Sequence, residues 1–314
     1  MGLRHGTPVG NGHSHISFDG TGMNMNRRTL LKASAASMVL PPFSVWADFE
    51  KQALTAAPSE IQLLPDEYGK TQVWGFDGRA PGPEIRVTLG ARVRRRRINN
   101  LPVPTAVHWH GIRIHNGMDG VAGLTQSAIE PGDHIDYDFI APDAGTYWYH
   151  SHNRSFEQVA RGLHGALIVD ELDLIDIDHD EVLVLDDWLI DPETAQIAAS
   201  FGAMHDLSHA GRLGNYVTTN GTYNLAKPVG RNERLRLRLI NASNARIFQL
   251  ALDGLEGWIV ALDGMPLQQP SPVQDAFVLA PAQRVVLFVD FTAVVGGAGL
   301  LVLFDRYECF SLVA

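Results

Sequence analysis

LGARVRRRRINN, residues Leu89–Asn100, and VGRNERLRLRLINA, residues Val229–Ala242, are two copies of one pattern that decides the fold. In each copy a glycine is followed by a stretch of polar and apolar residues that is typical of a half-buried β-strand. The first copy continues with VHWHG and IEPGDHIDYDF, which ends at Phe139; the second continues with FQLALDG and LAPAQRVVLFVDF, which ends at Phe291. The same order of strands and turns is therefore predicted twice.

Short strands at this spacing, with few long helical periods, indicate Greek-key β-sandwich or barrel domains. We therefore predict an all-β fold with two tandem domains, over residues 48–172 and 173–314. The acidic run ELDLIDID, residues Glu171–Asp178, breaks the pattern and is expected to be a solvated connection. A brief helical segment is expected near Ser155–Gly162.

Charge and cysteine content restrict the function. The 314 residues carry a formal net charge of −10, which argues against a nucleic-acid partner because phosphate binding needs clustered cations. The basic run Arg92–Arg97 lies inside a predicted strand, so we do not interpret it as a binding patch. Cys309 is the single cysteine, so this chain can form neither an intramolecular disulfide nor a CxxC metal site.

Residues 1–47 are interpreted as a polar tail followed by an export signal. MNMNRRTLLKASAASMVLPPFSVWA, residues Met23–Ala47, contains a paired arginine, an apolar stretch and small residues before a cleavage point after Ala47, which is the pattern of a twin-arginine signal peptide. The apolar run Thr29–Leu40 has 12 residues, too few for a membrane span, which needs roughly 20. A periplasmic protein without a membrane span is predicted.

Two histidine pairs form the candidate metal site. His108 and His110 flank Trp109, and His150 and His152 flank Ser151. Side chains at i and i+2 of a strand lie on the same face, so two such pairs at strand ends can bring four imidazoles to one point. Neutral imidazole binds copper, zinc, iron and nickel. The absence of an HExxH or HxHxDH run in this sequence argues against a zinc hydrolase.

The remaining histidines of the repeat region occur singly, and we predict that they are surface or hydrogen-bonded residues: His115, His134, His164, His179, His205 and His209. Of these, His205 and His209 would share a face of a helix at i and i+4, which keeps them as second candidates. In the second copy Phe248, Gln249 and Leu250 stand where the first copy has HWH. Metal is therefore expected in the first copy alone.

The stretch from Ala106 to Glu171, with its HWHG and HSH motifs, resembles the first cupredoxin domain of the multicopper oxidases. WGFDGRAPGPEIRV before it and HDLSHAGRLGNYVTTNG after it fit the same family, so the resemblance covers about Thr71 to Phe291. It implies two tandem cupredoxin-like domains and a laccase-like oxidase. In that family a type 1 copper takes electrons from a small reducing substrate, a phenol or a metal ion, and a trinuclear copper cluster reduces dioxygen to water.

The resemblance also implies roles for single residues. By position, His108 would bind the type 2 copper, and His110, His150 and His152 would bind the type 3 pair. Asp119, in NGMDGVAG, matches an acidic residue that handles protons near the cluster. The alternative is an ordinary aspartate in a glycine-rich turn.

This sequence departs from the family in one large respect. The HPxHLHG-like and HCHxxxH-like runs, which carry the other four cluster histidines and the type 1 site, are absent from this sequence, and Cys309 has no neighbouring histidine. We therefore expect a truncated chain with half of the cluster ligands, no type 1 site and no stand-alone activity. The uncovered histidine face could favour self-association. The alternatives are a periplasmic copper-binding module and a non-catalytic relative.

Overall fold

The computed structural model describes residues 52–292, 298–303 and 308–313. Strands dominate these residues, and the described helices are short: the 3-10 helix η1 (Asn116–Met118), α3 (Ser155–Gln158) and α4 (Met204–Ser208). The predicted all-β fold is confirmed. None of the described helices is long and apolar enough to cross a membrane. The proposed tail and signal peptide, residues 1–47, lie outside the described residues.

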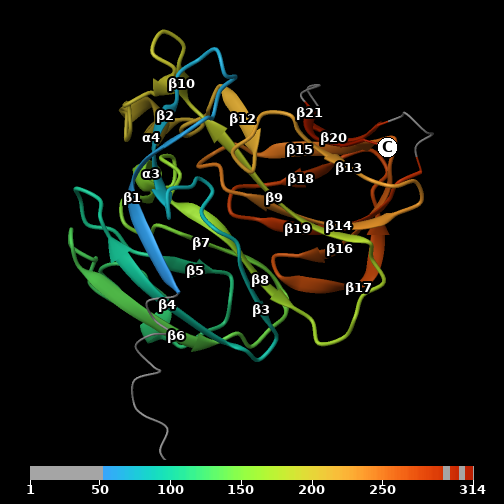
Figure 1. Cartoon of the computed structure of the whole chain (residues 1–314), viewed down its shortest axis with the longest axis horizontal. Helices are drawn as coiled ribbons and strands as arrows, with labels where there is room; N and C mark the ends of the chain where they lie inside the picture. The colour runs from blue at the N-terminus through green and yellow to red at the C-terminus, as the bar shows by residue number, and fades with distance from the viewer. Residues whose placement is uncertain (1–51, 293–297, 304–307, 314) are drawn as a thin grey trace, which may run out of the picture. The chain divides into compact units, whose positions relative to one another are not determined.

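The first eight strands form two four-stranded sheets (Figure 1), with the orders β2-β1-β4-β6 and β3-β8-β7-β5. Within them β1 pairs in parallel with β4, and β3 pairs in parallel with β8, while the other neighbours are antiparallel. Their bounds are β1 Ala53–Ile61, β2 Thr71–Phe76, β3 Ile85–Thr88, β4 Arg92–Asn99, β5 His108–His110, β6 His134–Ile140, β7 Gly145–His150 and β8 His164–Asp170.

The later strands form larger sheets with the orders β12-β9-β14-β19-β16-β17 and β13-β21-β20-β15-β18, and β10 pairs with β11. Their bounds are β9 His179–Trp188, β10 Ile190–Asp191, β11 Gln196–Ile197, β12 Tyr216–Thr219, β13 Leu225–Pro228, β14 Arg234–Asn241, β15 Phe248–Asp253, β16 Glu256–Leu262, β17 Met265–Pro272, β18 Phe277–Leu279, β19 Arg284–Asp290, β20 Ala298–Leu303 and β21 Glu308–Val313.

The repeat read in the sequence is also a repeat of topology. Strand β4 lies between a parallel β1 and an antiparallel β6, and β14 lies between a parallel β9 and an antiparallel β19. The basic run Arg92–Arg97 lies in β4, where Arg92 and Arg96 form ion pairs with Asp138 and Asp136 of β6. These cross-strand pairs are the unit that stabilises a sheet.

Each strand set encloses its own hydrophobic cluster. Trp109, Tyr137 and Tyr149 are buried in the first, and Leu237, Phe248 and Leu287 are buried in the second. Cys309 belongs to the second cluster, where it is 3% exposed. A smaller cluster joins residues of both sets at their contact: Trp148, Ala166, Ile168, Val184, Ile240 and Ala242. Burial of these side chains supplies the main stabilising free energy.

Charged residues also connect the two strand sets. The carboxylate of Asp180 accepts hydrogen bonds from Arg236 Nη2 at 2.7 Å and from Arg238 Nε at 2.8 Å. Arg238 also donates to Thr146 Oγ1 of β7 at 3.0 Å, which links the second set to the first. Glu171 pairs with Arg236 at 3.0 Å, so the acidic run 171–178, predicted to be simply solvated, is anchored at its first residue.

Candidate metal centre

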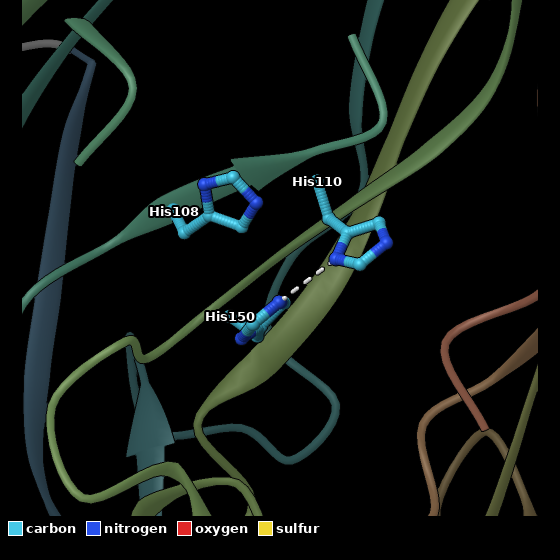
Figure 2. A group of neighbouring side chains, drawn as sticks. All are labelled: His108, His110 and His150. Carbon is cyan, nitrogen blue, oxygen red and sulfur yellow. Dashed lines mark hydrogen bonds between the residues drawn. The ribbon is translucent and has the colours of Figure 1, made fainter. Parts of the chain in front are cut away.

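The two histidine pairs meet because β5 lies beside β7. In this antiparallel register His108 is opposite His150, and His110 is opposite Trp148. Trp109, between the two histidines, is buried in the hydrophobic cluster, so alternation directs both imidazoles to the other face of the sheet. Figure 2 shows the rings of His108, His110 and His150 gathered around one space.

The spacing of these rings suits a shared ion. His110 Nδ1 lies 3.2 Å from His150 Nε2, and one nitrogen each of His108, His110 and His150 lie within 4.8 Å of one another. Two imidazoles that bind one ion with bonds of about 2.0 Å in tetrahedral geometry have nitrogens roughly 3.3 Å apart. The all-nitrogen donor set therefore fits a borderline metal such as copper.

His152 lies beside this group. Its side chain is exposed, and its ring centre is 5.3 Å from that of His108 and 6.1 Å from that of His150. All four histidines line one pocket of about 410 Å³. The structure thus brings three of the four predicted ligands into a tight group and places the fourth on the rim of the same pocket.

Neighbouring groups orient the imidazoles. His108 Nδ1 lies 2.9 Å from the backbone oxygen of Asp119 and 3.3 Å from its carboxylate. His150 Nδ1 lies 3.0 Å from the backbone oxygen of Ser151, and Trp148 packs on the His150 ring at 4.2 Å between centres. When Nδ1 donates a hydrogen bond, Nε2 is left as a lone-pair donor for a metal.

The turn between the paired histidines is held by a buried amide. Gln158 of α3 accepts hydrogen bonds from Ser151 Oγ and from Thr105 Oγ1, the latter at 2.8 Å, and donates one to the backbone oxygen of Pro104 at 2.9 Å. α3 is shorter than the helical segment predicted over residues 155–162. The sequence reading missed this support because a single glutamine carries no pattern.

Residues of the later strands complete the pocket. Residues 242–244 and 281–282 line it opposite the histidines. Arg284, at the start of β19, is buried against Gly111, where an added Cβ would lie 2.2 Å from its Nη2. Gly111 has φ of +84°, a conformation that glycine adopts without a penalty. No sequence pattern predicted that Arg284 lies beside Gly111, because the two residues are far apart in the chain.

The environment favours neutral imidazoles. Burial, followed by the charge of Arg284, lowers the pKa of His110 to about 4. Burial also lowers the pKa of His108, and it holds the pKa of His150 well below its usual range. Because a metal binds the deprotonated nitrogen, these side chains are ready as ligands at neutral pH.

The histidines predicted to be ordinary have other neighbours. His164 is fully buried, with Nε2 3.0 Å from Asp186, and His179 lies 2.8 Å from Glu233. His115 Nδ1 accepts from the backbone of Gly117. His134 is exposed, and His205 and His209 lie at α4.

Family models agree with this geometry. A model described as multicopper oxidase matches residues 58–173, and a second with the same description matches residues 179–296. The chain belongs to the multicopper oxidase family. The predicted family is thus confirmed, together with the cupredoxin-like fold and with copper as the family's cofactor.

Known multicopper oxidases resemble the chain over most of its length. It is 28% identical to copper resistance protein A of Pseudomonas syringae pv. tomato, over 85% of this chain and 52% of that protein. It is 33% identical to multicopper oxidase MmcO of Mycobacterium tuberculosis, over 74% of this chain and 50% of that protein. The chain therefore spans about half the length of these curated relatives.

The fold comparison agrees. The crystal structure of a multicopper oxidase from Pseudomonas thermotolerans matches with a TM-score of 0.78 and 35% identity, covering 83% of this chain and 62% of that one. Lac15 from a marine microbial metagenome matches with a TM-score of 0.72 and 41% identity, over 83% of this chain and 65% of that one.

The lowered histidine pKa values predict an acid-sensitive apoprotein. Between about pH 6.5 and 4 the unfolded chain binds protons at these imidazoles that the folded chain does not. The free energy of unfolding of the copper-free chain should therefore fall as the pH is lowered through this range, and His110→Gln should reduce the slope. Urea unfolding between pH 4.5 and 7 measures it, with the exposed His134→Gln as control. An unchanged slope in His110→Gln would contradict the prediction.

Proposed function

We propose that His108, His110, His150 and His152 are copper ligands that supply this chain's share of a trinuclear cluster. The proposed activity is oxidation of a small reducing substrate, a phenol or a metal ion, coupled to reduction of dioxygen to water. The observation that carries the proposal is the convergence of His108, His110 and His150 from two paired strands, with donor nitrogens within 4.8 Å of one another. Family membership supports copper as the metal.

Copper bound here would supply the one-electron chemistry that dioxygen reduction needs. The chain's own residues would prepare the site. The backbone oxygens of Asp119 and Ser151 would fix the rings of His108 and His150 through Nδ1. His110 and His150 would share an ion, which their 3.2 Å separation supports, and His152 would reach a second ion from the rim. Asp119, whose carboxylate lies 3.3 Å from His108 Nδ1, would take part in handling protons at the site.

We also propose the domain division of the sequence reading, with the first cupredoxin domain over residues 48–172 and the second over 173–314. The separate hydrophobic clusters of the two strand sets support it. In this division the cluster ligands come from the first domain, and the second has Phe248, buried in its hydrophobic cluster, where the first has the HWH run.

A copper-binding module without turnover is the second candidate. Within residues 52–292, 298–303 and 308–313, the histidine group at β5 and β7 is the only cluster of three or more potential ligands found. Four imidazoles give too few ligands for three coppers, so this chain alone would bind copper without reducing dioxygen.

Copper content and oxygen uptake test both candidates. The full chain, loaded with copper and dialysed, should retain about one or two ions at these four imidazoles, and His108→Ala/His150→Ala should lose them. His115→Ala/His134→Ala is the matched control and should keep them. Oxygen uptake with a phenolic dye that disappears in the ligand variant would support the oxidase and contradict the module, whereas bound copper without uptake is the result expected of four imidazoles alone and supports the copper site that both candidates share. Equal copper in the wild type and the ligand variant would refute both.

We further propose export to the periplasm through the signal in residues 23–47, which rests on its paired arginines and short apolar run. Replacing Arg27 and Arg28 by lysine should retain the chain in the cytoplasm. Fractionation of cells that express each form measures this, and equal periplasmic amounts would contradict the proposal.

A further inference from the structure

Helix α4 presents a second pair of histidines outside the pocket already described. His205 and His209 are four residues apart, and their rings are stacked with 4.4 Å between centres and 6° between planes. Both are exposed, His205 with 80% of its side chain accessible. The nitrogen lone pairs lie in the ring planes, so each exposed ring must turn about its Cβ–Cγ bond for the two to meet at one ion, and the i, i+4 spacing on one side of the segment brings both within reach of it.

The segment that carries the pair is anchored. The ring of Phe201, just before α4, contacts the guanidinium groups of Arg161 and Arg212 at 4.4 and 4.3 Å. Arg212 is buried and donates hydrogen bonds to the backbone oxygens of Ala198 and Ser200. These contacts fix both ends of the loop, so the pair belongs to a defined local structure.

The hydrogen bonds of the pair leave suitable lone pairs. Nδ1 of His209 lies 3.3 Å from the backbone oxygen of His205 and 3.0 Å from Ser208 Oγ. Nδ1 of His205 lies 4.0 Å from the carboxylate of Asp206. Nδ1 of His209 is engaged in this way, so its Nε2 is the donor available to a metal, whereas His205 has no hydrogen bond at Nδ1 to any described residue and its Nε2 can serve equally.

We propose that His205 and His209 form a second metal site, which binds copper(II) with Nε2 of both rings and completes its shell with water. Two imidazoles suit a borderline divalent ion, and among divalent first-row metals copper(II) binds such nitrogen ligands most tightly. The exposed thioether of Met204, 77% accessible, stands at the start of the same helix as a soft donor.

The site lies near the rim of the histidine pocket. A side-chain atom added at Gly202 would meet the ring of Phe156 at 3.1 Å, and Phe156 lines that pocket. α3 and α4 are accordingly neighbours in Figure 1. Copper held at α4 would be open to solvent and would lie on a segment that contacts Phe156, a residue of the pocket lining.

The test uses the full chain in the His108→Ala/His150→Ala background, which removes two of the four proposed pocket ligands from every chain that is compared. Copper(II) is titrated by equilibrium dialysis and by the paramagnetic resonance signal of nitrogen-ligated copper. The decisive variant adds His205→Ala/Leu207→His, which keeps the number of histidines but changes the spacing to i and i+2, where side chains do not face each other. Leu207 is exposed, so this exchange leaves the core unchanged.

In the background chain we expect one copper(II) bound at α4. The respaced variant should bind it about tenfold more weakly or worse, because its second imidazole no longer acts at high effective concentration. Equal affinity in both chains, or no copper(II) bound in the background chain, would overturn the proposal. Since both chains carry the same two pocket substitutions, a difference between them is due to α4 alone, and either result leaves the proposed cluster to its own test.

Discussion

Replacing Gly120 by alanine is expected to destabilise the chain by about 3 kcal/mol or more and to abolish copper binding at the pocket. Gly120 has φ of +81°, and a Cβ there would lie 1.6 Å from the backbone oxygen of Val107 and 3.2 Å from Cα of His108. The obstacle is backbone, which cannot rotate away as a side chain would. Either the loop that carries Asp119 or the strand that carries His108 must move.

Gly123→Ala is the matched control. Gly123 also has a positive φ, +80°, but nothing lies within 4 Å of its added Cβ. It should cost only the left-handed backbone strain, about 1 to 2 kcal/mol. Urea unfolding and copper content of both variants separate strain from collision. Equal losses of stability, with copper retained in both, would show that the close approach at Gly120 has no consequence.

Asp180→Asn is expected to cost about 3 to 5 kcal/mol, because it removes the shared counter-charge of two buried arginines. Arg238 is 1% and Arg236 6% exposed, and both donate to the Asp180 carboxylate. A neutral amide leaves Arg236 with Glu171 as its carboxylate partner at 3.0 Å and leaves Arg238 with only the longer contacts to Asp170 at 3.5 Å and Glu171 at 3.9 Å. Loss of stability should appear as a lower urea midpoint, and the link from Arg238 to Thr146 across the strand sets should weaken with it.

Asp138→Asn is the control for this change. Its partner Arg92 has 56% of its side chain exposed, and such surface pairs contribute up to about 1 kcal/mol. Lowering the pH should reduce the free energy of unfolding, as Asp180→Asn does. Burial opposes ionisation of Asp180, yet Arg238 and Arg236 hold its pKa below the usual range, so this stabilisation is present above about pH 4 and is lost as the pH falls below it. A similar cost for both variants would refute the argument from burial.

Much of the fold could be predicted because strand patterns are local. The alternation in Leu89–Asn100 and Val229–Ala242 gave strands β4 and β14, and the HxH spacing correctly placed His108 and His110 on one face. The roles of these histidines and of Asp119 remain predictions, although the contact between Asp119 and His108 gives them a geometric basis.

The surroundings of the site could not be predicted from the sequence. Arg284 reaches Gly111 across 173 positions of the chain, and no periodicity reports such a contact. The same holds for Arg238 and Thr146. Trp148 and His150 are two residues apart on one strand, so the alternation predicts that they share a face. It does not predict that their rings pack with 4.2 Å between centres. Contacts between distant segments are fixed by packing, which local rules do not encode.

Residues 242–244 and 281–282 line the histidine pocket, and Arg284 lies against Gly111, the neighbour of His110 in the chain, so the second strand set contributes to the surroundings of the ligands. The strand set β9–β21 holds none of the pocket's four histidines. The surface and the charge that it presents to the first strand set nevertheless affect how those histidines bind a metal. Exchanging residues 179–313 for those of a relative would therefore change the metal affinity of the histidine pocket while leaving His108, His110, His150 and His152 in place. Substitutions within residues 179–313 can thus change the metal affinity of the pocket, although none of the pocket's histidines lies there.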